Sequence, residues 1–164
     1  MFVVNNYEKL IKFKMPNGKN IDILDNVGQI FKKNIQYHGL PEAGGVLIGY
    51  THSSLGSVVI EEATEPQLDD SRTFLGFFRK SFHHLKAVKE AKIKNSGYMG
   101  NWHTHPCNYP EPSSTDIKSW KESLDKESSS CGYLFFIIIG LKGYRIWAGN
   151  VLTKNIVEIF QMER

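Results

Sequence analysis

The central stretch of this 164-residue chain reads GYMGNWHTHP from Gly97 to Pro106. Residues 97–104 are typical of a β-strand, and Pro106 ends it because proline has no amide hydrogen for the strand ladder. His103 and His105 are two residues apart. In an extended chain such side chains face the same way, about 6.5–7 Å from one another. Both imidazoles can therefore reach one metal ion.

A third metal ligand follows this strand after a short loop. Ten residues separate His105 from Asp116. Two prolines stiffen the loop, and Ser113 or Ser114 is expected to cap a helix, which places Asp116 in its first turn, facing back toward the histidines. Two histidines and one carboxylate leave a fourth position of zinc open for water, as in catalytic sites. Simpler interpretations stay open: an ordinary pair of polar histidines, and an aspartate that only favours the helix dipole.

A general base is expected upstream, at Glu42. This glutamate precedes an apolar run of strand length, residues 43–50, so its carboxylate lies at the mouth of a buried strand. There it can take a proton from water and pass it to a leaving amine. Glu61 and Glu62, after the strand 58–60, are alternatives. A solvated loop residue is the simpler interpretation of Glu42.

Taken together, these residues resemble the signature of the JAB/MPN (JAMM) metalloprotease family. The matching elements are Glu42-x-x-Gly45-x-Leu47-x-Gly49, Trp102-His103-Thr104-His105-Pro106 and Ser113-x-x-Asp116. The combination is far more specific than any single element. The resemblance implies that zinc is held by His103, His105 and Asp116. It also implies that Glu42 is the general acid and base, and that the Ser113 hydroxyl supports the oxyanion of the tetrahedral intermediate as well as capping the helix.

The residues around the motif are similar to one bacterial branch of the family. Residues 100–106, residues 112–116 and the spacing from Asp116 to Trp120 look like the JAB proteins of integrative and conjugative elements. That group includes the isopeptidase of cyclic-nucleotide anti-phage (CBASS) operons. The resemblance implies a protein substrate with an extended C-terminal tail, either ubiquitin-like or a nucleotidyltransferase conjugate, and E1-like and E2-like operon partners. DNA-repair-associated JAB proteins share the Pro-x-Pro-Ser run, so that alternative stays open.

Composition and charge set limits on the function. The length suits one JAB/MPN-like domain over residues 1–164. A formal net charge of +3 is too small to indicate nucleic-acid binding. No apolar stretch approaches the ~18 residues of a membrane span, and the start lacks a signal-peptide pattern. We therefore expect a cytoplasmic protein with reduced thiols. Cys107 lies two residues from His105, so its thiolate is a candidate to join the metal site, with a bystander thiol as the simpler interpretation.

Two other function classes compete with the metallopeptidase. A non-catalytic interaction module with the same fold has no need for a complete ligand set and a base. A zinc deaminase needs a Pro-Cys-x-x-Cys element, whereas residues 106–110 read PCNYP and supply no second cysteine. The deaminase is excluded on this ground.

The order of strands and helices predicts an α+β domain: a mixed, mostly antiparallel sheet flanked by about three helices. The JAB resemblance implies the same fold, which is cytidine-deaminase-like. Strands are expected at 7–14, 20–24, 44–50, 57–63, 97–104, 133–140, 143–149 and 155–161. Helices are expected at 25–35, 81–95 and 114–127, and Asp25 is expected to cap the first of them. Residues 135–139 should form a central buried strand. Residues 64–73 form a loop long enough to be functional, and we expect His83 and His84 to be surface or capping residues.

Overall fold

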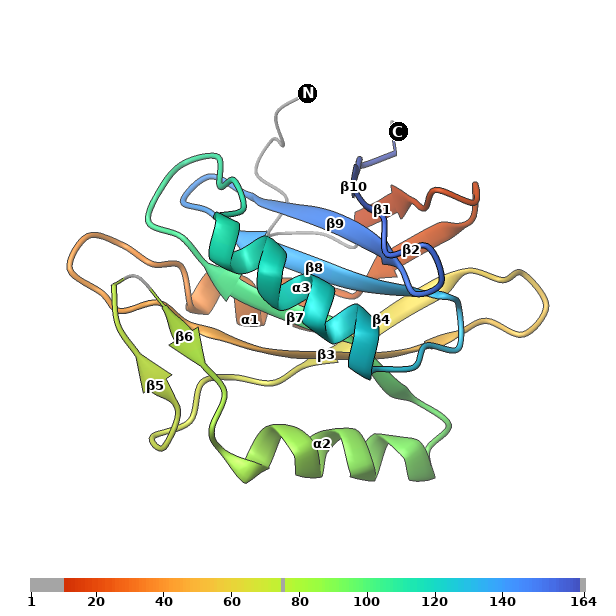
Figure 1. Cartoon of the computed structure of the whole chain (residues 1–164), viewed down its shortest axis with the longest axis horizontal. Helices are drawn as coiled ribbons and strands as arrows, with labels where there is room; N and C mark the ends of the chain where they lie inside the picture. Colours follow the sequence, from red (N-terminus) through yellow and green to blue (C-terminus); the bar gives the residue numbers. More distant parts are fainter. Residues whose placement is uncertain (1–10, 75, 163–164) are drawn as a thin grey trace.

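An eight-stranded mixed sheet lies at the centre of the computed structural model, which describes residues 11–74 and 76–162 (Figure 1). Its order is β1-β2-β4-β3-β7-β8-β9-β10. The strands are β1 (Ile11–Lys14), β2 (Asn20–Ile23), β3 (Gly44–Thr51), β4 (Val58–Ala63), β7 (Gly97–Thr104), β8 (Tyr133–Ile139), β9 (Tyr144–Asn150) and β10 (Ile156–Ile159). Only the β2/β4 and β7/β8 neighbours are parallel among the described strands of this sheet. The predicted α+β class is confirmed. The predicted strand residues 7–10 lie outside the described range.

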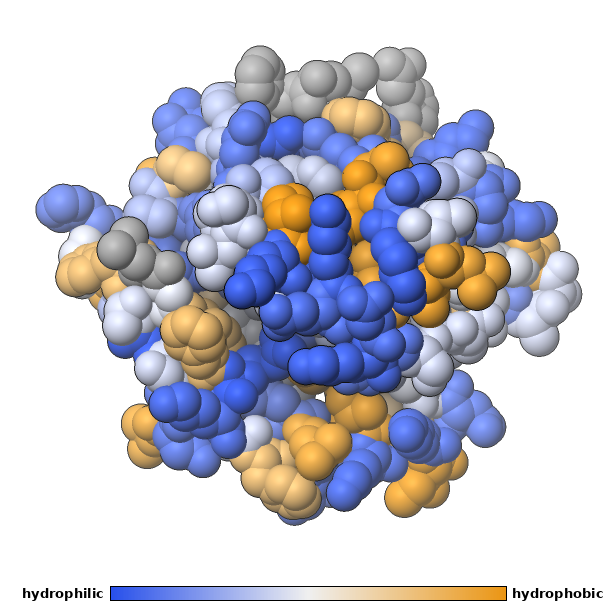
Figure 2. All heavy atoms as spheres, in the orientation of Figure 1, coloured by the Kyte–Doolittle hydropathy of each residue, from blue (hydrophilic) through white to orange (hydrophobic). Residues whose placement is uncertain are grey.

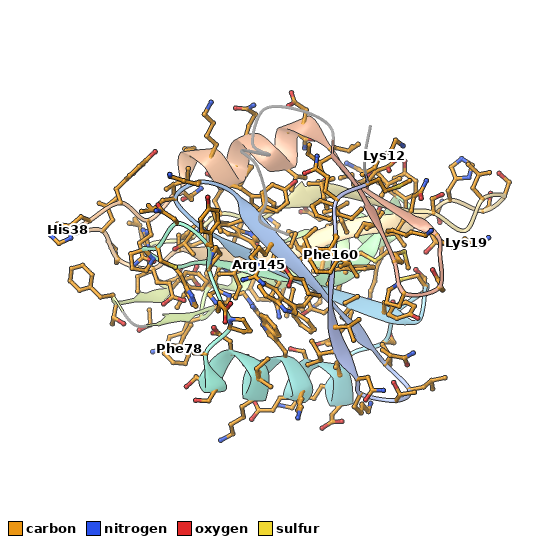
Figure 3. The ribbon with its side chains drawn as sticks, turned by 90° about the horizontal axis from the view of Figure 1, so that it is seen from above. Lys12, Lys19, His38, Phe78, Arg145 and Phe160 are labelled. Carbon is orange, nitrogen blue, oxygen red and sulfur yellow. The ribbon has the colours of Figure 1, made fainter. Side chains whose placement is uncertain are left out.

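Three helices of the described chain cover the two faces of the sheet. They are α1 (Asp25–Lys33), α2 (Phe82–Ile93) and α3 (Ser114–Lys126). In β8, Phe135 and Ile137 pack in the core with Phe31 of α1, while Phe136 packs with Trp120 of α3. Figure 3 shows α1 and α3 on opposite sides of the sheet. The strand 135–139 is therefore buried on both faces, as its unbroken apolar run predicts.

The outward surface of α3 is mostly hydrophilic (Figure 2). This matches an amphipathic helix whose other face is buried. None of the helices in the described ranges combines the length and the apolar composition that a bilayer crossing requires.

Two helix predictions need correction. Helix α1 ends at Lys33 rather than at Ile35, although Ile35 is buried in the core. Asp25 is the first helical residue rather than the cap, which is Leu24 with no side-chain bond. A carboxylate in the first turn still interacts favourably with the positive end of the helix dipole, so its value to the helix survives the one-residue shift.

A short hairpin forms where the sequence predicts only a loop. It consists of β5 (Ser71–Arg72) and β6 (Phe77–Phe78), paired antiparallel. Strands of two residues carry no measurable alternation, so sequence periodicity gives no signal for them. The hairpin lies beside the start of β3, where Arg72 and Thr73 are hydrogen-bonded to the backbone of Glu42.

An irregularity in β7 sets which residues face the site. Gly100 has φ +133°, and a Cβ there would lie 1.7 Å from the Phe135 carbonyl oxygen, so only glycine fits. The β3/β7 register shifts opposite this point, between Leu47 and Ile48. As a result Trp102 packs against α1, while His103 faces α3 on the other side of the sheet.

Candidate metal centre

The two histidines meet at the end of β7. His103 is the penultimate residue of that strand, paired with Gly44 of β3 and Ile138 of β8. The His105 amide continues this arrangement by donating to the Ile139 carbonyl. The two Nε2 atoms are 3.1 Å apart. The extended backbone thus points both rings at one place, as expected for residues i and i+2.

Asp116 completes the cluster from the first turn of α3. Its Oδ1 lies 3.2 Å from Nε2 of His103, and its Oδ2 lies 3.3 Å from Nε2 of His105. A capping box fixes this position: the Asp116 amide donates to Ser113 Oγ at 3.0 Å, and the Ser113 amide donates to Asp116 Oδ2 at 2.9 Å. The structure therefore brings the three predicted ligands together.

The donor set and spacing fit a zinc ion. Two ligand atoms bound tetrahedrally to zinc at its usual distances lie about 3.3 Å apart. The separations of 3.1, 3.2 and 3.3 Å among the imidazole and carboxylate atoms are close to this value. Two imidazoles and one carboxylate are also a usual ligand set of catalytic zinc.

The protonation states also suit metal binding, which requires neutral imidazole and ionised carboxylate. Burial lowers the pKa of His103, and the nearby Asp116 only partly opposes this effect. Burial by itself would raise the pKa of Asp116, but hydrogen bonds with His103 and His105 hold that pKa well below its usual range. The imidazole and the carboxylate are therefore held in the forms that bind metal.

Glu42 also lies next to the histidines. Its Oε1 is 4.0 Å from Nε2 of His103, and its side chain is 8% exposed. Glu42, His103 and His105 form a group whose ligand atoms all lie within 4.8 Å of one another. Burial raises the pKa of Glu42 to about 7, with His105 lowering it and Asp116 raising it further. A carboxyl group with this pKa exchanges protons readily near neutral pH.

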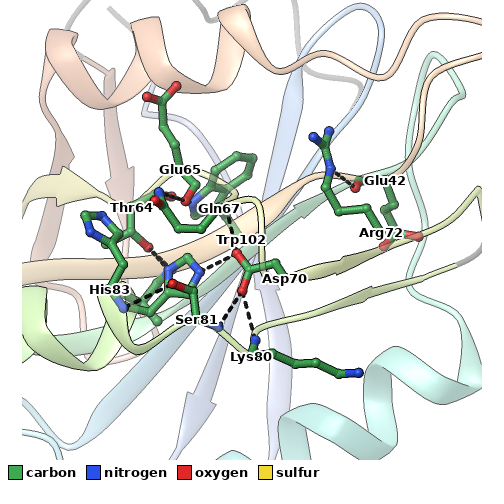
Figure 4. Close-up of polar contacts among 12 residues, drawn as sticks. Glu42, Thr64, Glu65, Gln67, Asp70, Arg72, Lys80, Ser81, His83 and Trp102 are labelled. Atoms are coloured by element: carbon green, nitrogen blue, oxygen red, sulfur yellow. Dashed lines mark hydrogen bonds and ion pairs between the residues drawn. The ribbon is translucent and has the colours of Figure 1, made fainter.

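The position of Glu42 depends on backbone contacts to distant segments. Its amide donates to the Thr73 carbonyl at 2.7 Å, and Arg72 Nε donates to its carbonyl at 3.0 Å (Figure 4). The next residue, Ala43, donates its amide to Oγ1 of Thr104 at 2.9 Å. Glu42 is thus held between the β5–β6 hairpin and the end of β7. These supporting residues were not predicted, because their side chains carry no local pattern.

The other residues that the sequence offers as base or ligand lie away from the cluster or are not in the ionisation state that metal binding requires. Glu61 accepts a hydrogen bond from Ser96 Oγ, and Glu62 is exposed. Partial desolvation raises the pKa of the Cys107 thiol, although the residue is exposed, and this disfavours the thiolate that binds metals. His84 is not a surface residue as predicted: it is 3% exposed and bonded on both ring nitrogens. Its partners come from separate parts of the chain, so the sequence gives no sign of its burial.

A groove lies beside the cluster, between α2 and α3. Its volume is about 410 Å³. Val46 and Tyr98 from the sheet line it, and Ser119 lies one turn of α3 beyond Asp116. Arg79, at the same groove, is close enough to His103 to lower the pKa of that imidazole. Ser119 and Arg79 thus place one end of the groove towards the candidate metal centre, although Glu42, His103, His105 and Asp116 do not themselves line it.

A family model and named relatives indicate the same protein family. Residues 35–150 match the model described as prokaryotic homologs of the JAB domain. The chain is similar to a protein of Escherichia coli (strain TW11681) named CD-NTase/cGAS isopeptidase, with 35% identity over 121 residues that cover 72% of each chain. A protein of the same name from Vibrio cholerae serotype O1 is 32% identical over 128 residues, 76% of each chain.

Solved structures support the same fold. The protein DSY2949 from Desulfitobacterium hafniense superposes with a TM-score of 0.56 and 20% sequence identity, over 87% of this chain and 90% of that one. At this identity the likeness concerns architecture alone. The family match over residues 35–150 includes Glu42, His103, His105 and Asp116, the four residues of the cluster described above. The chain therefore belongs to the prokaryotic JAB family, in the bacterial branch that its sequence motifs resemble.

Proposed function

We propose that this protein is a zinc-dependent isopeptidase. It would cleave the amide bond after the C-terminal tail of a ubiquitin-like or ubiquitin-style conjugated protein, by deconjugation or precursor processing. The observation that carries the proposal is the meeting of His103, His105 and Asp116 with a buried Glu42 carboxylate. The isopeptidase names of relatives that cover most of the chain support a hydrolase. We also propose one cytoplasmic metallopeptidase domain and a role in bacterial anti-phage defence.

The chain's own groups divide the work of amide hydrolysis. His103, His105 and Asp116 would hold the zinc ion, which when bound polarises the scissile carbonyl and lowers the pKa of the attacking water. An Oε atom of Glu42 accepts one proton from that water and delivers it to the amine nitrogen as the carbon–nitrogen bond breaks. The second proton of the water also ends on the amine, so the products are a carboxylate on the tail and a protonated amine.

Ser113 adds a hydrogen-bond donor at the same place. Its Oγ accepts from the Asp116 amide through a lone pair, which leaves the hydroxyl hydrogen able to donate. Ser113 lies at the amino end of α3, where the helix dipole also favours negative charge. We therefore propose that Ser113 Oγ donates to the oxyanion that develops on the scissile carbonyl.

The groove between α2 and α3 is the proposed place for part of the substrate tail. An extended chain presents alternate side chains to a surface, and Val46, Val88 and Tyr98 give this groove apolar contacts. The short β5–β6 hairpin offers a backbone edge on which a tail could pair. As part of this proposal, the names of the relatives suggest a tail that belongs to a CD-NTase conjugate. E1-like and E2-like partners are proposed with it.

The proposal is tested with defined amide fusions. Ubiquitin-fold proteins and a nucleotidyltransferase are joined through their C-terminal residues to a second protein. Each fusion is incubated with the purified chain, with and without chelator, and products are identified by mass spectrometry. We expect one fusion to be cleaved directly after the tail, with activity lost on chelation, restored by zinc and lost in Glu42→Gln.

Two other results would contradict the proposal. Stoichiometric zinc without cleavage of any fusion would favour a non-catalytic binding module with the JAB fold. Salt-sensitive DNA binding without peptidase activity would favour a DNA-repair-associated role, since phosphate contacts make affinity depend on salt.

A further inference from the structure

A buried polar cluster next to the candidate site takes no part in the proposed chemistry. It consists of Thr64, Asp70 and His84, and we call it the Thr64–Asp70–His84 cluster. His84 Nδ1 lies 2.6 Å from Thr64 Oγ1, and His84 Nε2 lies 2.7 Å from Asp70 Oδ2. The side chains of His84 and Asp70 are 4% and 0% exposed. Buried polar groups of this kind are costly unless every bond is made.

The hydrogen bonds of the cluster allow one donor and one acceptor to be assigned to each contact. Thr64 Oγ1 accepts from the Val46 amide at 2.8 Å, so its hydroxyl hydrogen is available to donate to His84 Nδ1. Nε2 of His84 then carries the ring proton and donates it to Asp70. This assignment satisfies a neutral imidazole on both nitrogens. The cluster thereby links β3, α2 and the segment that precedes the hairpin.

Asp70 closes the base of the β5–β6 hairpin. Its Oδ1 accepts from the amides of Lys80 and Ser81, both at 2.8 Å, and its Oδ2 accepts from the Gln67 amide at 2.8 Å (Figure 4). Residues on both sides of the hairpin are therefore tied to one carboxylate. Burial would raise the pKa of Asp70, but the hydrogen bonds from Ser81, His84, Gln67 and Lys80 lower it to about 2.

The hairpin in turn holds both backbone polar groups of Glu42. The Thr73 carbonyl accepts from the Glu42 amide, and Arg72 Nε donates to the Glu42 carbonyl. The Phe77 ring packs against the Cα of Gly44, where an added Cβ would lie 2.6 Å from Phe77 Cδ1. Phe77 also contacts the cluster, because its ring lies edge-on to that of His84 with 6.5 Å between the ring centroids.

We propose that Thr64, Asp70 and His84 are positioning residues that hold the β5–β6 hairpin against Glu42 and thereby set the carboxylate beside His103. The inference rests on the proposed function, since it assigns the cluster to the alignment of the general base. It differs from a role in folding alone because loss of the cluster should change the site at an unchanged fold. A displacement of about 1 Å at a catalytic group can cost 100-fold in rate.

The test uses a matched pair of substitutions at Thr64. Thr64→Val removes the hydroxyl at nearly constant volume, and Thr64→Ser keeps it. Amide hydrogen exchange at Glu42 is followed by NMR in the zinc-free protein, and kcat, KM and zinc stoichiometry are measured on a cleaved fusion. Thr51→Val is the control, because Thr51 ends β3, the strand beside β4, and its hydroxyl is hydrogen-bonded to Ser130 at the surface.

We expect Thr64→Val to speed exchange of the Glu42 amide about tenfold and to lower kcat about tenfold, with KM within about twofold and zinc binding unchanged. Thr64→Ser should restore both values, and Thr51→Val should change neither. Asp70→Asn weakens the hydrogen bonds that close the base of the hairpin, so it should also speed exchange of the Glu42 amide and lower kcat. This variant replaces Thr64→Val if that protein does not fold.

Faster exchange at the Val46 amide alone, with exchange at Glu42 and kcat unchanged, would overturn the inference, because it would show that the hydroxyl only satisfies a neighbouring amide. A loss of zinc or a rise in KM in place of the fall in kcat would overturn it as well. Failure of the wild-type chain to cleave any fusion would refute the proposed function instead, while exchange at Glu42 would still decide whether the cluster controls that residue.

Discussion

The two sides of the candidate site are built in different ways. His103, His105 and Asp116 come from one strand, one loop and one helix turn that follow each other in the sequence. Glu42 comes from the start of β3 and is held by the β5–β6 hairpin and the end of β7. Local geometry therefore positions the proposed ligands, whereas contacts between distant segments position the proposed base.

The two acidic residues of the site also differ in charge state. The hydrogen bonds with His103 and His105 keep Asp116 ionised, although burial opposes this. Glu42 is similarly buried but has no such donors at its carboxylate among the described contacts, so burial raises its pKa to about 7. Carboxyl groups whose pKa values are pushed apart in one site serve different roles. This difference supports the proposed roles, metal binding for Asp116 and proton transfer for Glu42.

The largest effect should follow from loss of a ligand on the local side. In His105→Ala, we expect bound zinc to fall below stoichiometric and cleavage to drop about 1,000-fold or more, since a metal ion supplies several kcal/mol of transition-state stabilisation. Elemental analysis and fusion cleavage measure the two quantities. His52→Ala, in the exposed turn after β3, is the matched control. Full zinc content in His105→Ala would remove this histidine from the ligand set.

The next largest effect should separate the base from the ligands. Glu42→Gln keeps the shape of the side chain but cannot accept a proton, so kcat should fall about 100-fold to 10,000-fold. Zinc content should stay at the wild-type level. Glu62→Gln, an exposed change on β4, should leave kcat unchanged. If Glu42→Gln lost zinc as well, the glutamate would belong with the ligands and the distinction between the two sides would fail.

A smaller effect is expected at Ser113, where capping and catalysis overlap. Ser113→Ala should lower kcat about 10-fold to 100-fold through loss of an oxyanion donor, and should lower the free energy of unfolding by about 1 kcal/mol through loss of the cap. Ser113→Thr keeps a hydroxyl and should retain most of both. Kinetics and thermal unfolding measure the two effects separately. A change in stability alone would leave Ser113 with a capping role only.

The smallest effect concerns the pH dependence of stability in the zinc-free protein. The pKa of Glu42 is raised from 4.5 to about 7 on folding, so the folded state binds more protons than the unfolded state between these values. Its contribution to stability is therefore full below pH 4.5 and is lost as the pH rises through 7. Glu42→Gln should flatten this part of the curve, measured by denaturant unfolding. Parallel curves for the two proteins would show that Glu42 titrates normally.

Several features were predictable because their signals are local. The spacing of His103 and His105 on an extended strand, and the Ser113-x-x-Asp116 capping box, depend on residues near each other in the chain. The buried strand 135–139 was predictable from its unbroken apolar run. The β5–β6 hairpin was missed because its strands are too short to show a period, and His84 was wrongly assigned to the surface for want of a visible partner.

The sequence by itself determined the α+β class, the buried strands and the ligand-bearing segment, because hydrophobic periodicity, proline and helix caps act over a few residues. Only the tertiary structure decided that Glu42 rather than Glu61 or Glu62 lies beside the histidines, and that His84 is enclosed with Thr64 and Asp70. These facts depend on the order of strands in the sheet and on hydrogen bonds between residues 14 to 30 positions apart. Such contacts form only when the whole sheet has folded and has excluded water from around them.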